Sequence, residues 1–326
     1  MGKSSGKTGR SAKYGASQPT VGETACCSGC AQGDSVPQGG TDPSYDQAFE
    51  RALLRAAARQ KELIGDRAAA DRALDDLERL DGHRQELLLR NSRRLTTFAA
   101  LERFLDSAVA AVATEPEVAI SWARRALALA PRLDPLHYGQ ALLHDSEARA
   151  WTIWAQAARV LGRLDEADEA LRRAYQSLLR GTRDPVERAT WLEARAELRV
   201  LQGEVDQAAS FHRRAAELFR EAGEENRAAG CFSALARLHR ESGQPERAVA
   251  AARQALSLAP SRLTVRFSAL FELAEALLAC GNFFAARGAL DEMRRLGADG
   301  VTSATANELA NRIDRALVPR RALGAS

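Results

Sequence analysis

LGRLDEADEALRRAY (161–175), QGEVDQAASFHRRAA (202–216), SGQPERAVAAARQAL (242–256) and CGNFFAARGALDEMR (280–294) are copies of one pattern. In each copy a glycine ends one helical stretch and an alanine follows five residues later. The glycines, Gly162, Gly203, Gly243 and Gly281, are 41, 40 and 38 residues apart. A partial copy, TEPEVAISWARRALALAP (114–131), precedes them. Such a period predicts a repeat architecture, because one helical pair covers its apolar face only by stacking on the next.

The spacing of small residues within the copies resembles the tetratricopeptide repeat. That family pairs two antiparallel helices, with three small positions, a turn glycine and a closing proline. Alanine fills the small positions in three successive units: Ala155, Ala167 and Ala174; Ala196, Ala208 and Ala215; Ala236, Ala248 and Ala255. Trp151 stands at the large aromatic position of the first unit, with Leu192 and Phe232 in its place later, and Pro131 and Pro260 at the closing position. The resemblance covers roughly residues 95–297, although the period exceeds the 34 residues of the family and Met293 replaces a small residue.

These observations predict an all-α fold, an α-solenoid of stacked antiparallel helix pairs with a disordered N-terminal tail. Residues 1–41 are rich in Gly, Ser, Thr and Gln, and we expect them to be disordered. Residues 42–92 are expected to form a charged helical segment, either a hairpin or a short coiled coil. The repeats then occupy 93–300, and a capping helix follows over 301–318. The stretch 86–108 also resembles bacterial proteins that join a helical segment to tetratricopeptide repeats.

Composition narrows the classes of partner. Aromatic residues make up 6% of the 326 residues and the net charge is +3, so nothing indicates the basic domain of a nucleic-acid-binding protein. No apolar run reaches the ~18 residues of a membrane span. No apolar segment of a secretory signal follows the basic N-terminus. We therefore expect a cytoplasmic protein that binds neither nucleic acid nor membrane.

Candidate chemical motifs are incomplete. GKSSGKT (2–8) has three residues between its first two glycines where a phosphate-binding loop has four, and no strand precedes it. Cys26, Cys27 and Cys30 have spacing that suits zinc or a redox pair, but a zinc site needs four ligands and position 23 is glutamate. Three thiols with Glu23, a metal shared by two chains, and uncommitted thiols all remain open. We predict no enzyme activity and no cofactor.

Other reactive side chains fit structural roles. His137, His144 and Asp145 are predicted to share one helix without a nucleophile at matching spacing. Cys231 and Cys280 are predicted to be core cysteines. The body of the chain thus offers no catalytic set.

The resemblance implies that the first helix of each repeat lines a concave groove that receives an extended or helical peptide. The groove positions would be Arg149, Gln156, Arg159, Glu193, Glu197, Arg237, Arg240, Glu241 and Glu275. The chaperone-type carboxylate clamp of the family uses Lys and Asn there, and both are missing. Alternating Arg and Glu instead favours a partner of mixed charge, or a solvated face.

We therefore predict a non-enzymatic scaffold for a protein or peptide. The alternative is a regulator or sensor in which the cysteine-containing tail or the N-terminal helices respond to metal, redox state or a partner. Neither the partner nor the oligomeric state follows from the sequence.

Overall fold

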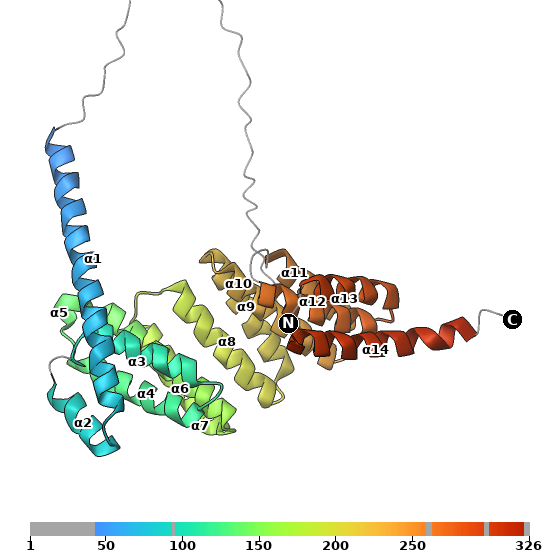
Figure 1. Ribbon diagram of the computed structural model, residues 1–326, viewed down its shortest axis with the longest axis horizontal. Helices are drawn as coiled ribbons and strands as arrows, with labels where there is room; N and C mark the ends of the chain where they lie inside the picture. The colour runs from blue at the N-terminus through green and yellow to red at the C-terminus, as the bar shows by residue number, and fades with distance from the viewer. Residues whose placement is uncertain (1–42, 93–94, 259–262, 297–299, 323–326) are drawn as a thin grey trace, which may run out of the picture. The chain divides into compact units, whose positions relative to one another are not determined.

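The computed structural model describes residues 43–92, 95–258, 263–296 and 300–322 (Figure 1). Within these ranges the chain forms α-helices α1 to α14 and the short 3-10 helix η2, with no strand. The predicted all-α fold is confirmed. The predicted disordered tail and its cysteines, Cys26, Cys27 and Cys30, lie outside the described residues.

The chain divides into two units, residues 1–55 and 56–326. The described part of the first unit is the beginning of α1 (Pro43–Glu78), which continues into the second. The second unit holds, in order, α2 (Gly82–Asn91), α3 (Phe98–Ala111), α4 (Pro116–Leu129), η2 (Ala130–Arg132), α5 (Pro135–Tyr138), α6 (Gln140–Val160), α7 (Leu164–Leu178), α8 (Pro185–Leu201), α9 (Val205–Glu221), α10 (Glu225–Glu241), α11 (Pro245–Leu258), α12 (Leu263–Ala279), α13 (Phe283–Leu296) and α14 (Gly300–Ala322).

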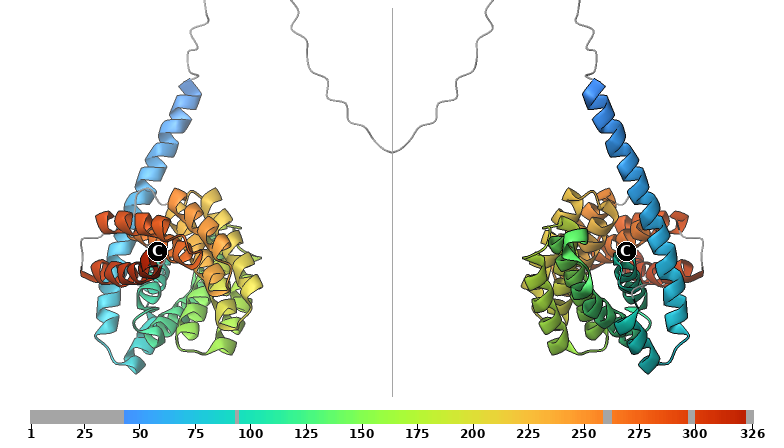
Figure 2. Two further views of the ribbon diagram at one scale, coloured as in Figure 1. Left: turned by 90° about the vertical axis from the view of Figure 1, so that its right-hand side faces the viewer. Right: turned by 90° about the vertical axis from the view of Figure 1, so that its left-hand side faces the viewer.

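Helices α6 to α13 form antiparallel pairs: α6 with α7, α8 with α9, α10 with α11 and α12 with α13 (Figures 1 and 2). Successive pairs pack against each other, so each pair buries the apolar face that the previous pair would otherwise expose to solvent. The stacked pairs are the α-solenoid that the repeats predict.

The turn inside each pair depends on its glycine. Gly162 has a φ of 74°, a left-handed conformation that strains residues with a side chain. This conformation lets the N–H of Arg163 reach the carbonyl of Ala158 at 2.9 Å, which closes the end of α6. The same conformation recurs at Gly203, Gly243 and Gly281, as the pattern predicts, and also at Gly223 between α9 and α10.

The core is built from small residues at the predicted positions. All the alanines of the three small positions are buried, at 2% exposure or less. Their short side chains let helix backbones approach closely, and larger residues such as Phe219 and Leu198 fill the spaces between. One continuous core joins α6 to α14, where Leu309 and Ile313 complete it.

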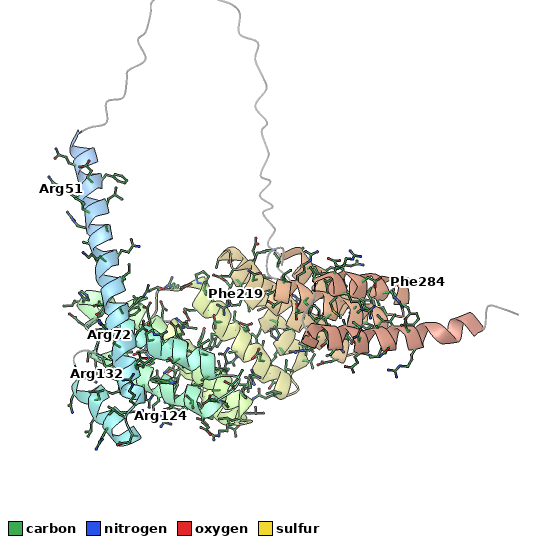
Figure 3. All side chains as sticks on the ribbon, viewed as in Figure 1. Arg51, Arg72, Arg124, Arg132, Phe219 and Phe284 are labelled. Carbon is green, nitrogen blue, oxygen red and sulfur yellow. The ribbon has the colours of Figure 1, made fainter. Side chains whose placement is uncertain are left out.

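Two predictions about single residues are wrong. Gly139, with a φ of 90°, separates α5 from α6, so His137 and His144 do not share a helix. Cys280 is exposed at the end of α12, whereas Cys231 is buried as predicted. The second helices also expose some apolar side chains, such as Phe284 of α13 (Figure 3).

Candidate functional site

The predicted groove residues lie on the first helices of the pairs. We call the surface formed by α6, α8, α10 and α12 the first-helix face. Arg149, Gln156 and Arg159 are on α6; Glu193 and Glu197 are on α8; Arg237, Arg240 and Glu241 are on α10; Glu275 is on α12.

Most of these charges pair with a residue on another helix of the array. The guanidinium of Arg149 lies 3.1 Å from Asp106 on α3, and that of Arg159 lies 2.7 Å from Glu197 on α8. Because each pair joins two successive elements of the array, these side chains hold helices together.

The pairing continues toward the C-terminal end. Arg227 of α10 lies 3.6 Å from Glu193 of α8, and its guanidinium also covers the ring of Phe219. Arg312 Nη2 of α14 donates a 2.9 Å hydrogen bond to Glu275 Oε2 of α12. We call this series of inter-helix pairs the charge ladder. It includes one further pair, Arg240 Nη2 of α10 at 3.6 Å from Glu272 Oε2 of α12.

The ladder partners Asp106, Arg227, Glu272 and Arg312 were not predicted as site residues. They are far from their partners in sequence, 43 residues for Asp106 and 37 for Arg312. These separations are close to one repeat period. Opposite charges one period apart are therefore the sequence signal that could have found them.

Burial shifts the acidity of the ladder carboxyls. Burial raises the pKa of Glu193, and the nearby Arg227 opposes that shift. Burial likewise raises the pKa of Glu272, and the nearby Arg240 and Arg237 oppose that shift. The thiol of Cys231 donates to Glu193 Oε1 at 3.8 Å, and burial raises its pKa as well. A thiol held in its protonated form is a poor nucleophile.

Arg237 differs from its neighbours on this face. It is exposed and forms none of the ladder pairs, whereas Gln156 is half-buried and Glu241 lies beside Arg240 at 3.6 Å. Arg237 borders a hollow of about 350 Å³ between α10 and α12. We call it the α10–α12 hollow; its lining is Gly230, Ser233, Ala234, Arg237, Thr264, Val265, Ser268 and Glu272.

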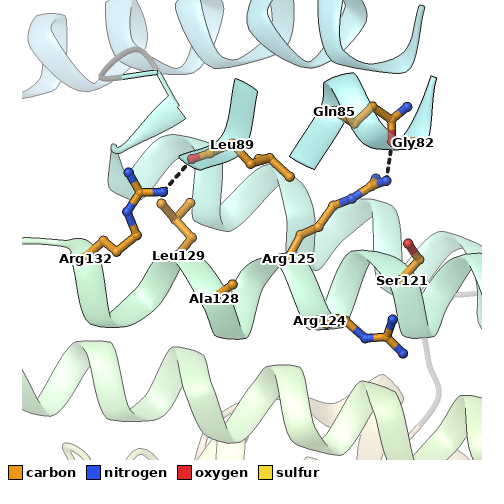
Figure 4. A pocket seen from close by; sticks show the side chains of 9 residues that line it. All are labelled: Gly82, Gln85, Leu89, Ser121, Arg124, Arg125, Ala128, Leu129 and Arg132. Carbon is orange, nitrogen blue, oxygen red and sulfur yellow. Dashed lines mark hydrogen bonds between the residues drawn. The ribbon is translucent and has the colours of Figure 1, made fainter. Parts of the chain in front are cut away.

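A larger pocket of about 570 Å³ lies between α2 and α4 (Figure 4). Its arginines are engaged with the protein. Arg125 donates to the side chain of Gln85, Arg132 donates to the carbonyl of Leu89 at 2.5 Å, and Arg124 covers the Trp154 ring at 5.4 Å. The first contact fastens α2 to α4, the second fastens α2 to η2, and the third joins α4 to α6.

The histidine and aspartate near the start of α6 do not form a catalytic set. Asp145 accepts hydrogen bonds from the N–H of Thr182 at 3.0 Å and from its hydroxyl at 2.5 Å, so it holds the loop between α7 and α8. His144 pairs with Glu147 at 3.0 Å. Across the described residues, no three His, Cys, Asp or Glu side chains gather as a metal site. The helices described there include none with the length and apolar character to cross a membrane.

Comparisons with known proteins agree with this architecture. Residues 187–261, which begin in α8 and extend past the last residue of α11, match the family model of the tetratricopeptide repeat. The crystal structure of BtubC (BKLC) from P. vanneervenii is similar with a TM-score of 0.53 and 20% identity, over 72% of this chain and 90% of that one. The pilF protein of Pseudomonas aeruginosa gives a TM-score of 0.46 and 17% identity, over 69% and 93%. No curated protein matches the chain significantly in sequence.

The fold and its repeating turns define a helical-repeat protein of the α-solenoid class. Within that class, residues 187–261 match the tetratricopeptide repeat, and the same turns and helix pairing recur from α6 to α13. At 20% identity the similarity to BtubC extends to the fold alone.

Proposed function

We propose that this protein is a non-enzymatic scaffold that binds a protein or peptide along the first-helix face, the groove of the repeat array. The α10–α12 hollow carries the proposal, because it opens on that face and its lining includes two residues, Ser233 and Glu272, with a polar atom that has no hydrogen-bond partner within the described residues.

The charge ladder has a defined part in this proposal. Arg149, Arg159, Glu193, Glu197 and Glu275 set the spacing of the first helices rather than contact the partner. Arg237 is left to contact the partner from the rim of the hollow. A rim charge acts mainly on the rate and specificity of association.

The test is crosslinked affinity capture from the native cell with the full chain, comparing Arg237→Glu with Arg253→Glu. Both arginines are exposed, but Arg253 lies on α11, a second helix. We expect capture of the partner to fall at least about tenfold with the first change and to persist with the second. Equal capture by both variants, with unchanged thermal unfolding, would remove the first-helix face as the binding surface.

A further inference from the structure

The α10–α12 hollow contains two buried polar atoms without a hydrogen-bond partner. Ser233 is 7% exposed and Glu272 is 8% exposed, and neither Ser233 Oγ nor Glu272 Oε2 forms a hydrogen bond within the described residues. Buried polar atoms are nearly always hydrogen-bonded, and leaving one unpaired lowers stability. Two such atoms from facing helices, lining one hollow, indicate a ligand that supplies the missing partners.

Gly230 leaves open space at the edge of the hollow. It lies inside α10, where glycine is less favourable than alanine because the flexible backbone must be fixed. A Cβ atom at this position would meet nothing within 4 Å, so packing within the protein does not require glycine. A glycine in such a place allows another backbone or group to approach the helix closely.

The charges of the lining select the chemistry of the ligand. Among the described residues of the lining, Arg237 and Glu272 are the charged ones, and their opposite charges cancel. Arg237 supplies donors at the rim, Glu272 supplies an acceptor inside, and the hydroxyl of Ser233 can do either. A cationic ligand would meet Arg237, and an anionic ligand would meet Glu272. A neutral group with one acceptor and two N–H donors satisfies both ends.

We propose that the α10–α12 hollow binds the side-chain carboxamide of a glutamine or asparagine in an extended peptide. The carbonyl oxygen accepts from Arg237, and the NH₂ group donates to Glu272 Oε2 and Ser233 Oγ. The open space over Gly230 receives the adjoining peptide. This inference rests on the proposed function and specifies one position of the ligand.

Three small probes test the chemistry directly: the N-acetyl methylamides of glutamine, glutamate and lysine, which share one backbone and differ in side-chain charge. Each is titrated into full-length protein with labelled valine methyl groups, and the Val265 resonance in the hollow is followed. We expect a saturable shift of Val265 with the glutamine probe and weaker binding, by roughly tenfold, of the other two. A preference for glutamate or lysine, or no shift with any probe, overturns the inference.

Two variants locate the binding. Gly230→Ala fills the open space and should weaken the glutamine probe by roughly tenfold or more, while raising the midpoint of thermal unfolding. Gly288→Ala is the matched control, because Gly288 is also an exposed glycine inside a helix, α13, with nothing within 4 Å of its added Cβ. Glu272→Gln should weaken the glutamine probe similarly, whereas Glu275→Gln, a buried carboxyl of the same helix outside the hollow, should not.

The outcome is separable from that of the capture experiment. If probes fail while Arg237→Glu still abolishes capture, the first-helix face binds its partner through other chemistry, and only the carboxamide inference is lost. If the probes bind but the Arg237→Glu variant captures as much partner as the native protein, the hollow recognises an amide, but the proposed function is wrong.

Discussion

Replacing Arg312 by alanine should loosen α14 from the array. Glu275 is 4% exposed and Arg312 is 45% exposed, so the change leaves a buried carboxylate without its partner. An exposed pair contributes about 1 kcal/mol at most, and breaking a fully buried pair costs about 3–5 kcal/mol. With one partner buried and the other half-exposed, we expect a loss of about 2 kcal/mol, between these limits.

The assay combines urea unfolding, followed by circular dichroism, with hydrogen exchange in α12 and α14. Hydrogen exchange is needed because repeat arrays open in segments, so a local loss can escape a global transition. Arg315→Ala is the control, since Arg315 lies on the same helix, is exposed, and bonds within α14 to the carbonyl of Asn311. The control should change stability by less than about 0.5 kcal/mol.

A double-mutant cycle separates the pair from other effects of the truncation. Glu275→Gln introduced beside Arg312→Ala removes the uncompensated charge and should recover part of the stability. The expected coupling energy is about 1–2 kcal/mol. Equal stability and exchange in Arg312→Ala and Arg315→Ala would refute the claim that the ladder holds α14 in place.

Three further changes test the core and the turns. Gly181→Ala should lower the free energy of unfolding by about 2 kcal/mol, because the added methyl group overlaps Asp145 Oδ1 and displaces the loop bonded to it; an unchanged urea midpoint would contradict this. Ala208→Leu should cost about 1–3 kcal/mol by overpacking, whereas Gln207→Leu, on the exposed side of α9, should be nearly neutral in the same assay. His212 is buried, and burial with the nearby Arg237 lowers its pKa to about 4. In the unfolded chain this histidine has its ordinary pKa of about 6.5, so it binds a proton at a higher pH than in the folded chain. The free energy of unfolding should therefore fall by about 3 kcal/mol as the pH drops from about 6.5 to 4. A His212→Leu variant with the same pH dependence as the native protein would refute this.

The features that could be predicted from the sequence are the ones that each repeat needs locally. A left-handed turn needs glycine, and a close helix crossing needs alanine, so Gly162, Ala167 and their counterparts recur at fixed spacing. Gly139 lies outside that pattern, and its backbone conformation divides α5 from α6 where the hydrophobic periodicity alone favours one helix. The exposure of Cys280 follows from its position directly after the last residue of α12, which periodicity does not distinguish from a core position.

The candidate site could be predicted only in part, because a charged residue on a helix face has the same spacing whether it meets a ligand or the next helix. Arg149 and Arg159 were assigned to the groove by their positions in the repeat, and they do lie on the first helices. Whether their charge is available depends on Asp106 and Glu197, which are placed by the stacking of whole repeats. The polar atoms of the hollow are equally hard to predict from the sequence. Whether they have hydrogen-bond partners depends on how α12 packs beside α10.

The charge ladder and the hollow meet at Glu272. Its Oε2 atom lies 3.6 Å from Arg240, too far for a hydrogen bond, so the carboxylate contributes to the ladder while keeping its accepting capacity for another donor. Arg240 is for this reason a poor residue with which to test binding. Its replacement would leave Glu272 buried without its cation and disturb the packing of α10 on α12, and a loss of capture would then have two causes. Arg237 borders the same hollow, is exposed and belongs to no ladder pair. Because its charge still acts on Glu272, a loss of capture on changing it reports on the ligand when thermal unfolding of the variant is unchanged.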